Sequence, residues 1–332
     1  MKRKLIIEDF GKMKRAEIDI SPLTLFVGDN NSGKSYLLAL LWGIYAAGTE
    51  SVIFFDMLEL LTDDYVRIYE QMCEFVLKAA EGYEQEIKIS SKLFVELFNK
   101  LLECNKDKFA SEIFNSEQIT IGKLAITVEQ EFEVTIEGQK TEYGIGISCK
   151  EGSFGMMFQK RRIENDLGYV IKTVFGGVML WIFEGSTEFH SRNTVYLPAA
   201  RTGFMLAKNV INKVSRQIAY DMAGIKDREE IQPFTKPIIH FLNMMEDLSL
   251  DYETKSGEII QWVETSMTHG RLQYGNELNG QEIRYLPDGS GVSLPLRTTS
   301  AVVTELTPLL LLLKYRRSLQ AICYEEPEMC LH

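Results

Sequence analysis

The segment "GDNNSGKS" at residues 28–35 places two glycines around four short polar residues, followed by a lysine and a serine. Glycines let the backbone curl until several N–H groups point inward at phosphate oxygens. Lys34 supplies a mobile positive charge to the β- and γ-phosphates of a nucleotide, and Ser35 offers a hydroxyl ligand to Mg²⁺. The spacing predicts a phosphate loop whose binding residues are Gly28, Asn30, Asn31, Ser32, Gly33, Lys34, Ser35 and Tyr36.

A pair of carboxylates follows an apolar stretch near the other end of the chain, in "AICYEEPEMCLH". If this stretch is a strand of a parallel sheet, Glu325 and Glu326 lie at its carboxyl edge, beside the phosphate loop. One carboxylate can hold Mg²⁺, directly or through water, and its neighbour can orient and deprotonate an attacking water. The alternative is a solvated acidic turn after a core strand.

The elements expected around the phosphate loop are a strand before it and a helix after it. In the first part of the chain we expect strands at 4–10, 16–20 and 23–27, a helix at 35–48, helices within 52–116, an antiparallel meander at 117–150 that turns at "EGQ", and a helix at 160–184. In the second part we expect a short strand and loop at 194–204, a helical insertion at 205–265, a hairpin at 282–296 that turns at "PDGSG", a helix at 300–317 and a buried strand at 319–324.

Composition limits the classes of function. The net charge of −11 over 332 residues argues against blanket affinity for nucleic acid or anionic membrane, although it leaves room for a local basic groove. The five cysteines form no CxxC pair and the four histidines are scattered, which disfavours a zinc site or a disulfide framework and suggests a reducing cytoplasm. The apolar runs at 169–183 and 306–314 are too short to cross a membrane.

Four separated segments carry a resemblance to a known group. The stretch from Glu8 to Leu37 resembles the opening of ATPases of the SMC, RecF and OLD group, which have ABC-type heads. "EEPEMCLH" is similar to their Walker B motif, with Glu325 where many ABC ATPases carry aspartate. "YLPAARTGF" (196–204) and "TTSAVVTELTPLLLLLKY" (298–315) resemble landmarks of the prokaryotic AAA-family, OLD-like ATPases found in anti-phage systems.

The resemblance implies an α/β P-loop NTPase of the ABC-ATPase type, with a mixed sheet, an antiparallel β portion and helical insertions. The implied organisation is an N-terminal part of the ATPase core at 1–50, an insertion at 51–193, a core strand and loop at 194–204, a helical insertion at 205–265 and a C-terminal part of the core at 266–332. Similar ATPases continue into a strand that ends in a switch histidine, and OLD nucleases continue into a TOPRIM domain. We therefore expect the rest of the machinery further along a longer chain or on another polypeptide. His332 receives no switch role, and no nuclease activity is assigned to these residues.

In ABC-type heads a serine-led helix start from a second subunit contacts the γ-phosphate. The resemblance places Ser300 in this role, but Thr299-Ser300-Ala301 stands where relatives often have Ser-Ser-Gly or Ser-Gly-Gly. The alternative is an ordinary N-cap on a core helix, and both roles are compatible.

Several basic residues have two possible roles each. Arg201 can reach a phosphate or a DNA backbone, or it can pair with an acidic neighbour and hold its loop. Lys12, Lys14 and Arg15 can approach the nucleotide or lie on a solvated strand face. The patches "QKRR" (159–162) and "KYRR" (314–317) are expected to be solvated helix ends, with DNA-backbone contact as the alternative.

Together these features predict an ATP-binding and hydrolysing head that forms a homodimer or higher oligomer around ATP. It would switch a nuclease or other effector in anti-phage defence, with DNA as a further possible partner and no membrane. Glu326 is the expected general base, Glu325 with Ser35 the Mg²⁺ site, Lys34 the phosphate clamp and Ser300 the contact in trans. The alternatives are a RecF-like repair or recombination ATPase, and an ATP-dependent assembly module with little turnover.

Overall fold

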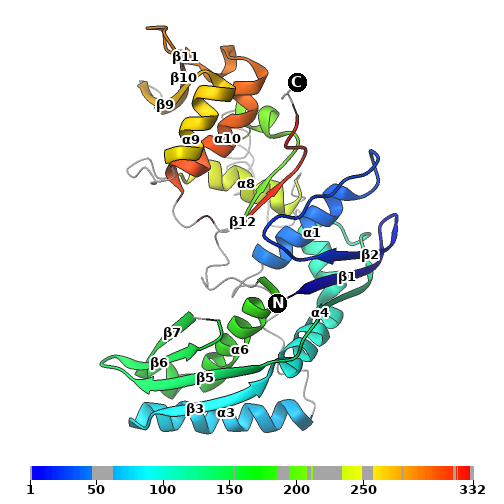
Figure 1. The fold of residues 1–332 in the computed structure, drawn as a ribbon, viewed down its shortest axis with the longest axis vertical. Coiled ribbons are helices and arrows are strands. Elements are labelled where there is room, and N and C mark those ends of the chain that lie inside the picture. Colours follow the sequence, from blue (N-terminus) through cyan, green and yellow to red (C-terminus); the bar gives the residue numbers. More distant parts are fainter. Residues whose placement is uncertain are drawn as a thin grey trace, which may run out of the picture. The chain divides into compact units, whose positions relative to one another are not determined.

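Figure 1 shows the chain as a computed structural model in which helices and strands are mixed throughout the sequence. The structure describes residues 2–46, 63–152, 154–184, 194–207, 211, 234–248, 257–277, 280–316, 319 and 321–329. These residues fall into two compact units, Met1–Arg192 and Asn193–His332, and each unit is described by itself below.

The first unit contains an antiparallel sheet that leads into the phosphate loop. Its strand order is β2 (Met13–Asp19), β1 (Arg3–Phe10) and β4 (Ile121–Val128). Strand β1 buries Leu5 and Ile7 on one face, and the residues between and beside them, Lys4, Ile6 and Glu8, are more accessible, which is the alternation expected for an antiparallel sheet with one solvated side; Phe10 at its end is buried as well. This sheet confirms the strands predicted at 4–10 and 16–20.

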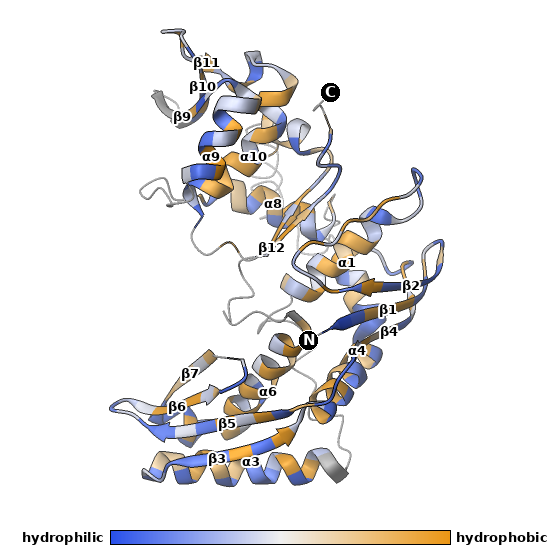
Figure 2. Cartoon of the chain, viewed as in Figure 1, coloured by the Kyte–Doolittle hydropathy of each residue, from blue (hydrophilic) through white to orange (hydrophobic). Residues whose placement is uncertain are grey.

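The helix after the loop, α1 (Lys34–Ala46), is apolar along most of its length, as Figure 2 shows. It packs closely on α4 (Ser91–Phe114), because a Cβ on Gly43 would lie 2.2 Å from Ile113 Cδ1. Helix α4 is in turn fastened to the sheet by Asn99, whose side-chain amide exchanges two hydrogen bonds with the backbone of Ile126. The phosphate loop therefore leads into a helix that is packed firmly on α4, which is itself hydrogen-bonded to the sheet.

The apolar segment 23–27 is not a strand, contrary to the prediction. Leu23, Leu25 and Val27 are 74%, 71% and 92% exposed, and no strand among the described residues pairs with this segment. A strand exists only when a neighbour accepts its backbone hydrogen bonds, so apolar composition alone did not make this segment a strand.

A second antiparallel sheet in this unit has the order β3 (Gln85–Ser90), β5 (Glu133–Lys140), β6 (Gly144–Cys149) and β7 (Phe154–Gln159). Figure 1 shows it with the helices α3 (Asp63–Glu81) and α6 (Leu167–Glu184), and the short helix α5 (Lys160–Asn165) follows β7 in the chain. No helix within the described residues is long and apolar enough to cross a bilayer.

The predicted meander at 117–150 is partly wrong. The "EGQ" residues 137–139 lie inside β5, and the chain reverses later, where Thr141 N donates to Gly144 O at 2.9 Å. Gly138 serves close packing instead, since a Cβ there would lie 2.7 Å from Phe75 Cζ on α3. In addition, β4 pairs with β1, and β3 falls in a range predicted to be helical.

The second unit holds a parallel pair of strands, β8 (Thr194–Leu197) and β12 (Ala321–Tyr324), which confirms the strands predicted there. Its other elements are α8 (Lys236–Glu246), α9 (Gly257–Val263), a π-helix η3 (Glu264–Thr268), β9 (Gly270–Glu277), β10 (Gly280–Pro287), β11 (Leu294–Pro295), a 3₁₀ turn η4 (Leu296–Thr298) and α10 (Ala301–Tyr315). The predicted hairpin is formed by β10 and β11, with Gly289 at φ 70° in its turn. Strand β9 was not predicted.

The C-terminal end of α10 is not the solvated basic patch that "KYRR" suggested. Lys314 is buried and its ammonium bonds Glu264 of η3 at 2.5 Å and the carbonyl of Leu272 at 3.2 Å. The other patch is solvated as predicted: Lys160 is exposed and pairs with Glu164, and the Arg162 guanidinium lies over the Tyr169 ring.

A half-buried histidine makes the stability of the chain sensitive to acid. Burial, and secondarily the charge of Arg316, lowers the pKa of His240 on α8 to about 4. The unfolded chain binds this proton near pH 6.5, so between pH 6.5 and 4 the unfolded state carries more protons and stability falls as the pH falls.

Acidification from pH 7 to 4.5 is therefore expected to lower the free energy of unfolding by about 2 kcal/mol through His240. The variant His240→Gln should lose less stability than the wild type between pH 7 and pH 4.5, because glutamine has no proton to gain. Denaturant titrations of both proteins at the two pH values measure the difference. Parallel losses in the two proteins would assign the acid sensitivity to other groups.

Candidate nucleotide site

The phosphate loop is curled around its own lysine. Lys34 Nζ donates to the carbonyls of Gly28 and Asp29, both at 2.7 Å. Two residues carry positive φ, Asn31 at 63° and Gly33 at 99°, and these give the loop its tight curvature. Helix α1 begins directly at Lys34, so the N–H groups of its first turn lie at the loop. The loop thus has the backbone shape and the positive charge that an anion requires.

The rest of the loop is divided between exposed and packed residues. Asn30, Asn31, Ser32 and Ser35 are exposed, which leaves their polar groups accessible to a ligand. Gly33 has no room for a side chain, because a Cβ would lie 3.2 Å from Met13 Cε in addition to the strain of its φ.

Tyr36 packs with its ring rather than presenting it to a ligand. The ring stacks on Phe114 at a centroid distance of 4.9 Å and tilts against Phe10 at 5.7 Å. These contacts fix the start of α1 on the first unit, and Tyr36 is still 41% exposed beside the loop.

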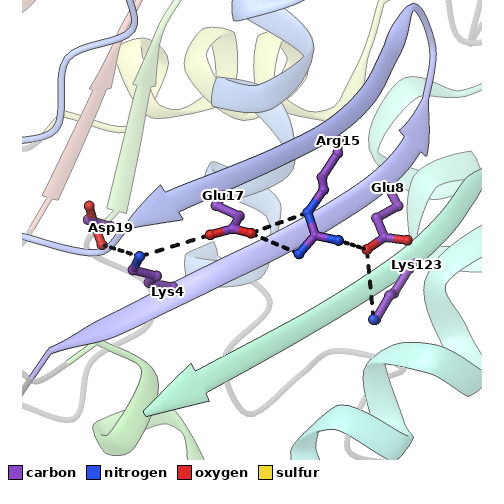
Figure 3. A network of polar contacts seen from close by, with 6 residues as sticks. All are labelled: Lys4, Glu8, Arg15, Glu17, Asp19 and Lys123. Carbon is purple, nitrogen blue, oxygen red and sulfur yellow. Dashed lines mark hydrogen bonds and ion pairs between the residues drawn. The ribbon is translucent and has the colours of Figure 1, made fainter. Parts of the chain in front are cut away.

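In the basic hairpin before the loop, Arg15 forms ion pairs with neighbouring carboxylates. Figure 3 shows a ladder of opposite charges across β2, β1 and β4, in which Arg15 pairs with Glu8 and Glu17, both at 2.8 Å. Lys4 pairs with Glu17 and Asp19 in the same network. The hydrogen bond to Glu17 raises the pKa of Arg15. For Arg15 the solvated strand face is therefore confirmed, and its charge is already neutralised.

At the acidic strand end, the first carboxylate is held from several sides. Glu325 N continues the parallel ladder by donating to Leu197 O at 3.0 Å, and its Oε2 accepts a hydrogen bond from Ala199 N at 2.8 Å. The pKa of Tyr196 is raised by burial, by the Glu325 charge and by a hydrogen bond between the two side chains. Glu325 is thus a half-buried carboxylate of fixed orientation.

The second carboxylate is free. Glu326 is exposed and has φ 39°, a left-handed conformation that is uncommon for a residue other than glycine. Its backbone carbonyl accepts from Arg201 Nη2 at 3.0 Å, but no described residue bonds its carboxylate. Two adjacent glutamates therefore have different surroundings: the Glu325 carboxylate is held by hydrogen bonds, and the Glu326 carboxylate is exposed to water.

Arg201 does not reach outward to a phosphate or to DNA. It is fully buried and forms an ion pair with Glu305 of α10, so of the two roles considered for it the structure shows the one that holds its loop.

Ser300 is the N-cap of α10. Its Oγ accepts from Val303 N at 3.4 Å, and its backbone is extended at φ −68° and ψ 158°. The side chain is exposed, as is the following Ala301, so the positive end of the helix is open to solvent. The structure thus shows the ordinary capping role of Ser300, and the exposed helix start leaves room for a contact with a γ-phosphate held by another subunit.

The second unit holds Ser300, Glu325 and Glu326, and the first unit holds Gly28 to Tyr36. The Ser35 hydroxyl of the first unit and the Glu325 carboxylate of the second unit are each oxygen groups of the kind that Mg²⁺ accepts. Within the described residues no group of three or more His, Cys, Asp and Glu side chains gathers as a metal cluster. Sequence reasoning missed Ala199 and Tyr196 as supports of Glu325, because neither a loop N–H nor a tyrosine hydroxyl has a sequence pattern that names its partner.

Comparison with known proteins identifies a family. The sequence profile of the family described as "AAA ATPase domain" matches residues 1–332. No curated protein and no solved structure shows a significant match to the chain. Because the family match covers both units, it includes the phosphate loop and the acidic strand end alike.

Proposed function

The chain belongs to the AAA ATPase domain family, and from this premise we propose that it is an ABC-type ATPase head that pairs with a second copy around ATP. Members of this family are P-loop ATPases that generally bind ATP with Mg²⁺. The observation that carries the finer proposal is the acidic strand end: a fixed carboxylate, Glu325, precedes a free one, Glu326, after a strand of a parallel pair.

Each residue has a distinct part in the proposed reaction. Lys34 exchanges its two loop carbonyls for phosphate oxygens, and the first-turn N–H groups of α1 add further donors. Ser35 and Glu325 hold Mg²⁺, which when bound neutralises phosphate charge. Glu326 orients the attacking water and takes its proton. The exposed position of Glu326 supports this role, because no described residue bonds its carboxylate and a water molecule can reach it.

Pairing of two heads is proposed from the helix start at Ser300. A serine N-cap with an exposed hydroxyl and an open positive helix end can bind the γ-phosphate of a nucleotide held by another copy. Only a contact that ATP makes and ADP lacks can drive such an association, because a ligand shifts an equilibrium by its differential affinity alone.

The use of this switch is proposed from the resemblance. The chain resembles OLD-like ATPases of anti-phage systems, so a nuclease or other effector is the partner we propose, with DNA as a further candidate. The departure at Ala301 favours one second candidate, an ATP-dependent assembly module with little turnover, because the missing glycine changes the backbone next to Ser300.

The test is the substitution Ser300→Arg, which puts a bulky charge at the proposed contact. Pairing is followed by energy transfer between copies labelled at the exposed Cys104, with an ATP analogue and with ADP. We expect ATP-dependent energy transfer in the wild type and its loss in Ser300→Arg, with the affinity of a single head for ATP unchanged.

The matched control is Ser290→Arg. Ser290 also accepts a backbone N–H, from Val292 at 3.1 Å, but it lies in the turn between β10 and β11. This variant should pair like the wild type. Energy transfer that is the same with ATP and ADP in the wild type would mean that the nucleotide is not sandwiched between heads.

A further inference from the structure

The guanidinium of Arg201 is enclosed completely, with 0% of the residue exposed. Arg201 opens a helical segment, 201–207, that follows strand β8 and Pro198. Burial of a charge is costly unless every part of it is paired or hydrogen-bonded. The groups that pair with Arg201 therefore indicate the role of this buried side chain.

Two of these partners are the backbone carbonyls of the acidic strand end. Arg201 Nη1 donates to Glu325 O at 2.7 Å, and Nη2 donates to Glu326 O at 3.0 Å. The guanidinium carbon lies 4.5 Å from the centre of the Tyr324 ring, and Nη1 also donates to Pro198 O at 3.1 Å. One side chain thus contacts three consecutive residues of the strand end and the loop after β8.

The remaining contact is with α10. Arg201 Nη2 forms an ion pair with Glu305, which is 1% exposed, and the second oxygen of this carboxylate accepts from the hydroxyl of Thr202. Glu305 lies in the second turn of the helix that Ser300 caps. The same guanidinium therefore joins the start of α10 to the acidic strand end.

The geometry of this fork restricts the Glu325–Glu326 backbone. Two carbonyls in succession are fixed by two nitrogens of one rigid plane, which a lysine ammonium cannot reproduce. Glu326 is held at φ 39°, a conformation that persists only where the surroundings impose it. Since no described residue bonds the Glu326 carboxylate, its direction depends on this backbone.

We propose that Arg201 is a positioning residue for ATP hydrolysis: it fixes the backbone that aims the Glu326 carboxylate at the attacking water, and Glu305 orients Arg201. This inference rests on the proposed ATPase function. It assigns to the buried ion pair a role in the reaction rate, beyond its role in packing.

The first test is Arg201→Lys in the full chain. Lysine keeps the charge opposite Glu305 but loses the planar fork, so kcat is expected to fall roughly 10- to 100-fold, as for small misplacements of a reacting group. The Kd for ATP should stay near the wild-type value, whereas the thermal midpoint should fall because buried carbonyls lose donors, so kcat is measured well below that midpoint. The matched control is Arg284→Lys, because Arg284 also forks, onto Ser293 and Glu282, in the β10–β11 hairpin. It should leave kcat unchanged.

The second test combines Arg201→Lys with Glu326→Gln and follows single-turnover phosphate release over long incubations. If Arg201 acts through Glu326, the lysine substitution slows the wild-type chain but adds no further loss to the Glu326→Gln chain. An equal loss in both backgrounds would overturn the inference, as would a loss of kcat that only tracks a lower affinity or a lower thermal midpoint.

A second variant covers the case in which Arg201→Lys does not fold. Glu305→Gln keeps the shape of the side chain and one acceptor oxygen for the guanidinium, turns the group facing Thr202 into an N–H donor, and removes the charge that orients the guanidinium. It is expected to lower kcat by a smaller factor, again only when Glu326 is present, and additive loss would overturn the inference. A wild-type protein without ATP turnover would overturn the proposed function and this inference together, whereas wild-type turnover with additive losses would overturn this inference alone.

Discussion

Replacing Glu326 by glutamine is expected to slow ATP turnover by about 10²- to 10⁴-fold, the usual contribution of a general base. The amide keeps the size of the side chain and loses the proton acceptor. The backbone of Glu326 is held by Arg201 independently of its carboxylate, so the fold of the strand end should survive. ATP binding should change little, and the variant should accumulate the ATP-bound state.

The matched control for this prediction is Glu328→Gln, two residues further along the same exposed turn. Steady-state phosphate release and equilibrium ATP binding, measured on both variants, separate a catalytic effect from a general loss of charge. If turnover persists unchanged in Glu326→Gln, the base must be sought at Glu325 or elsewhere.

Replacing Lys34 by alanine should weaken ATP binding by roughly a hundredfold, since charge-assisted hydrogen bonds contribute about 1.5–3 kcal/mol each. Two carbonyls hold Lys34 Nζ at 2.7 Å in the loop, so its charge already sits where phosphate would arrive. In the variant the carbonyls of Gly28 and Asp29 also lose their hydrogen-bond donor, so the loop should be less ordered before ATP binds.

Titration calorimetry with ATP and Mg²⁺ measures the effect, and Lys92→Ala is the control. Lys92 is an exposed lysine in the first turn of α4 that pairs with Glu96, so its loss changes the net charge equally at a position outside the loop. Wild-type affinity in Lys34→Ala would refute the phosphate-loop assignment.

Much of the site could be read from the sequence because its signals are local. The phosphate loop, the helix that begins at Lys34 and the strand before Glu325 depend on residues that are neighbours in the chain. The mixed α/β character followed from the same local patterns. Residue 317, the last of the second basic patch, and much of the predicted insertion at 205–265 lie outside the described residues.

The errors and omissions arose where distant residues decide. The segment 23–27 has the composition of a strand, but strand formation requires a partner that composition does not name. Gly138 resembled a turn glycine and instead admits Phe75 of α3. The partner of Arg201 lies 104 positions along the chain at Glu305, and nothing in either local sequence indicates the pairing.

Cysteine 323 lies on β12, two residues before the acidic pair, and burial raises the pKa of its thiol to about 12. Cys149 of β6 is buried as well, with a thiol pKa raised to about 11. Oxidants attack the thiolate, and at neutral pH these two sulfurs are almost entirely protonated and shielded. Peroxide is therefore expected to react at the exposed Cys104 before it reacts at Cys323 or Cys149.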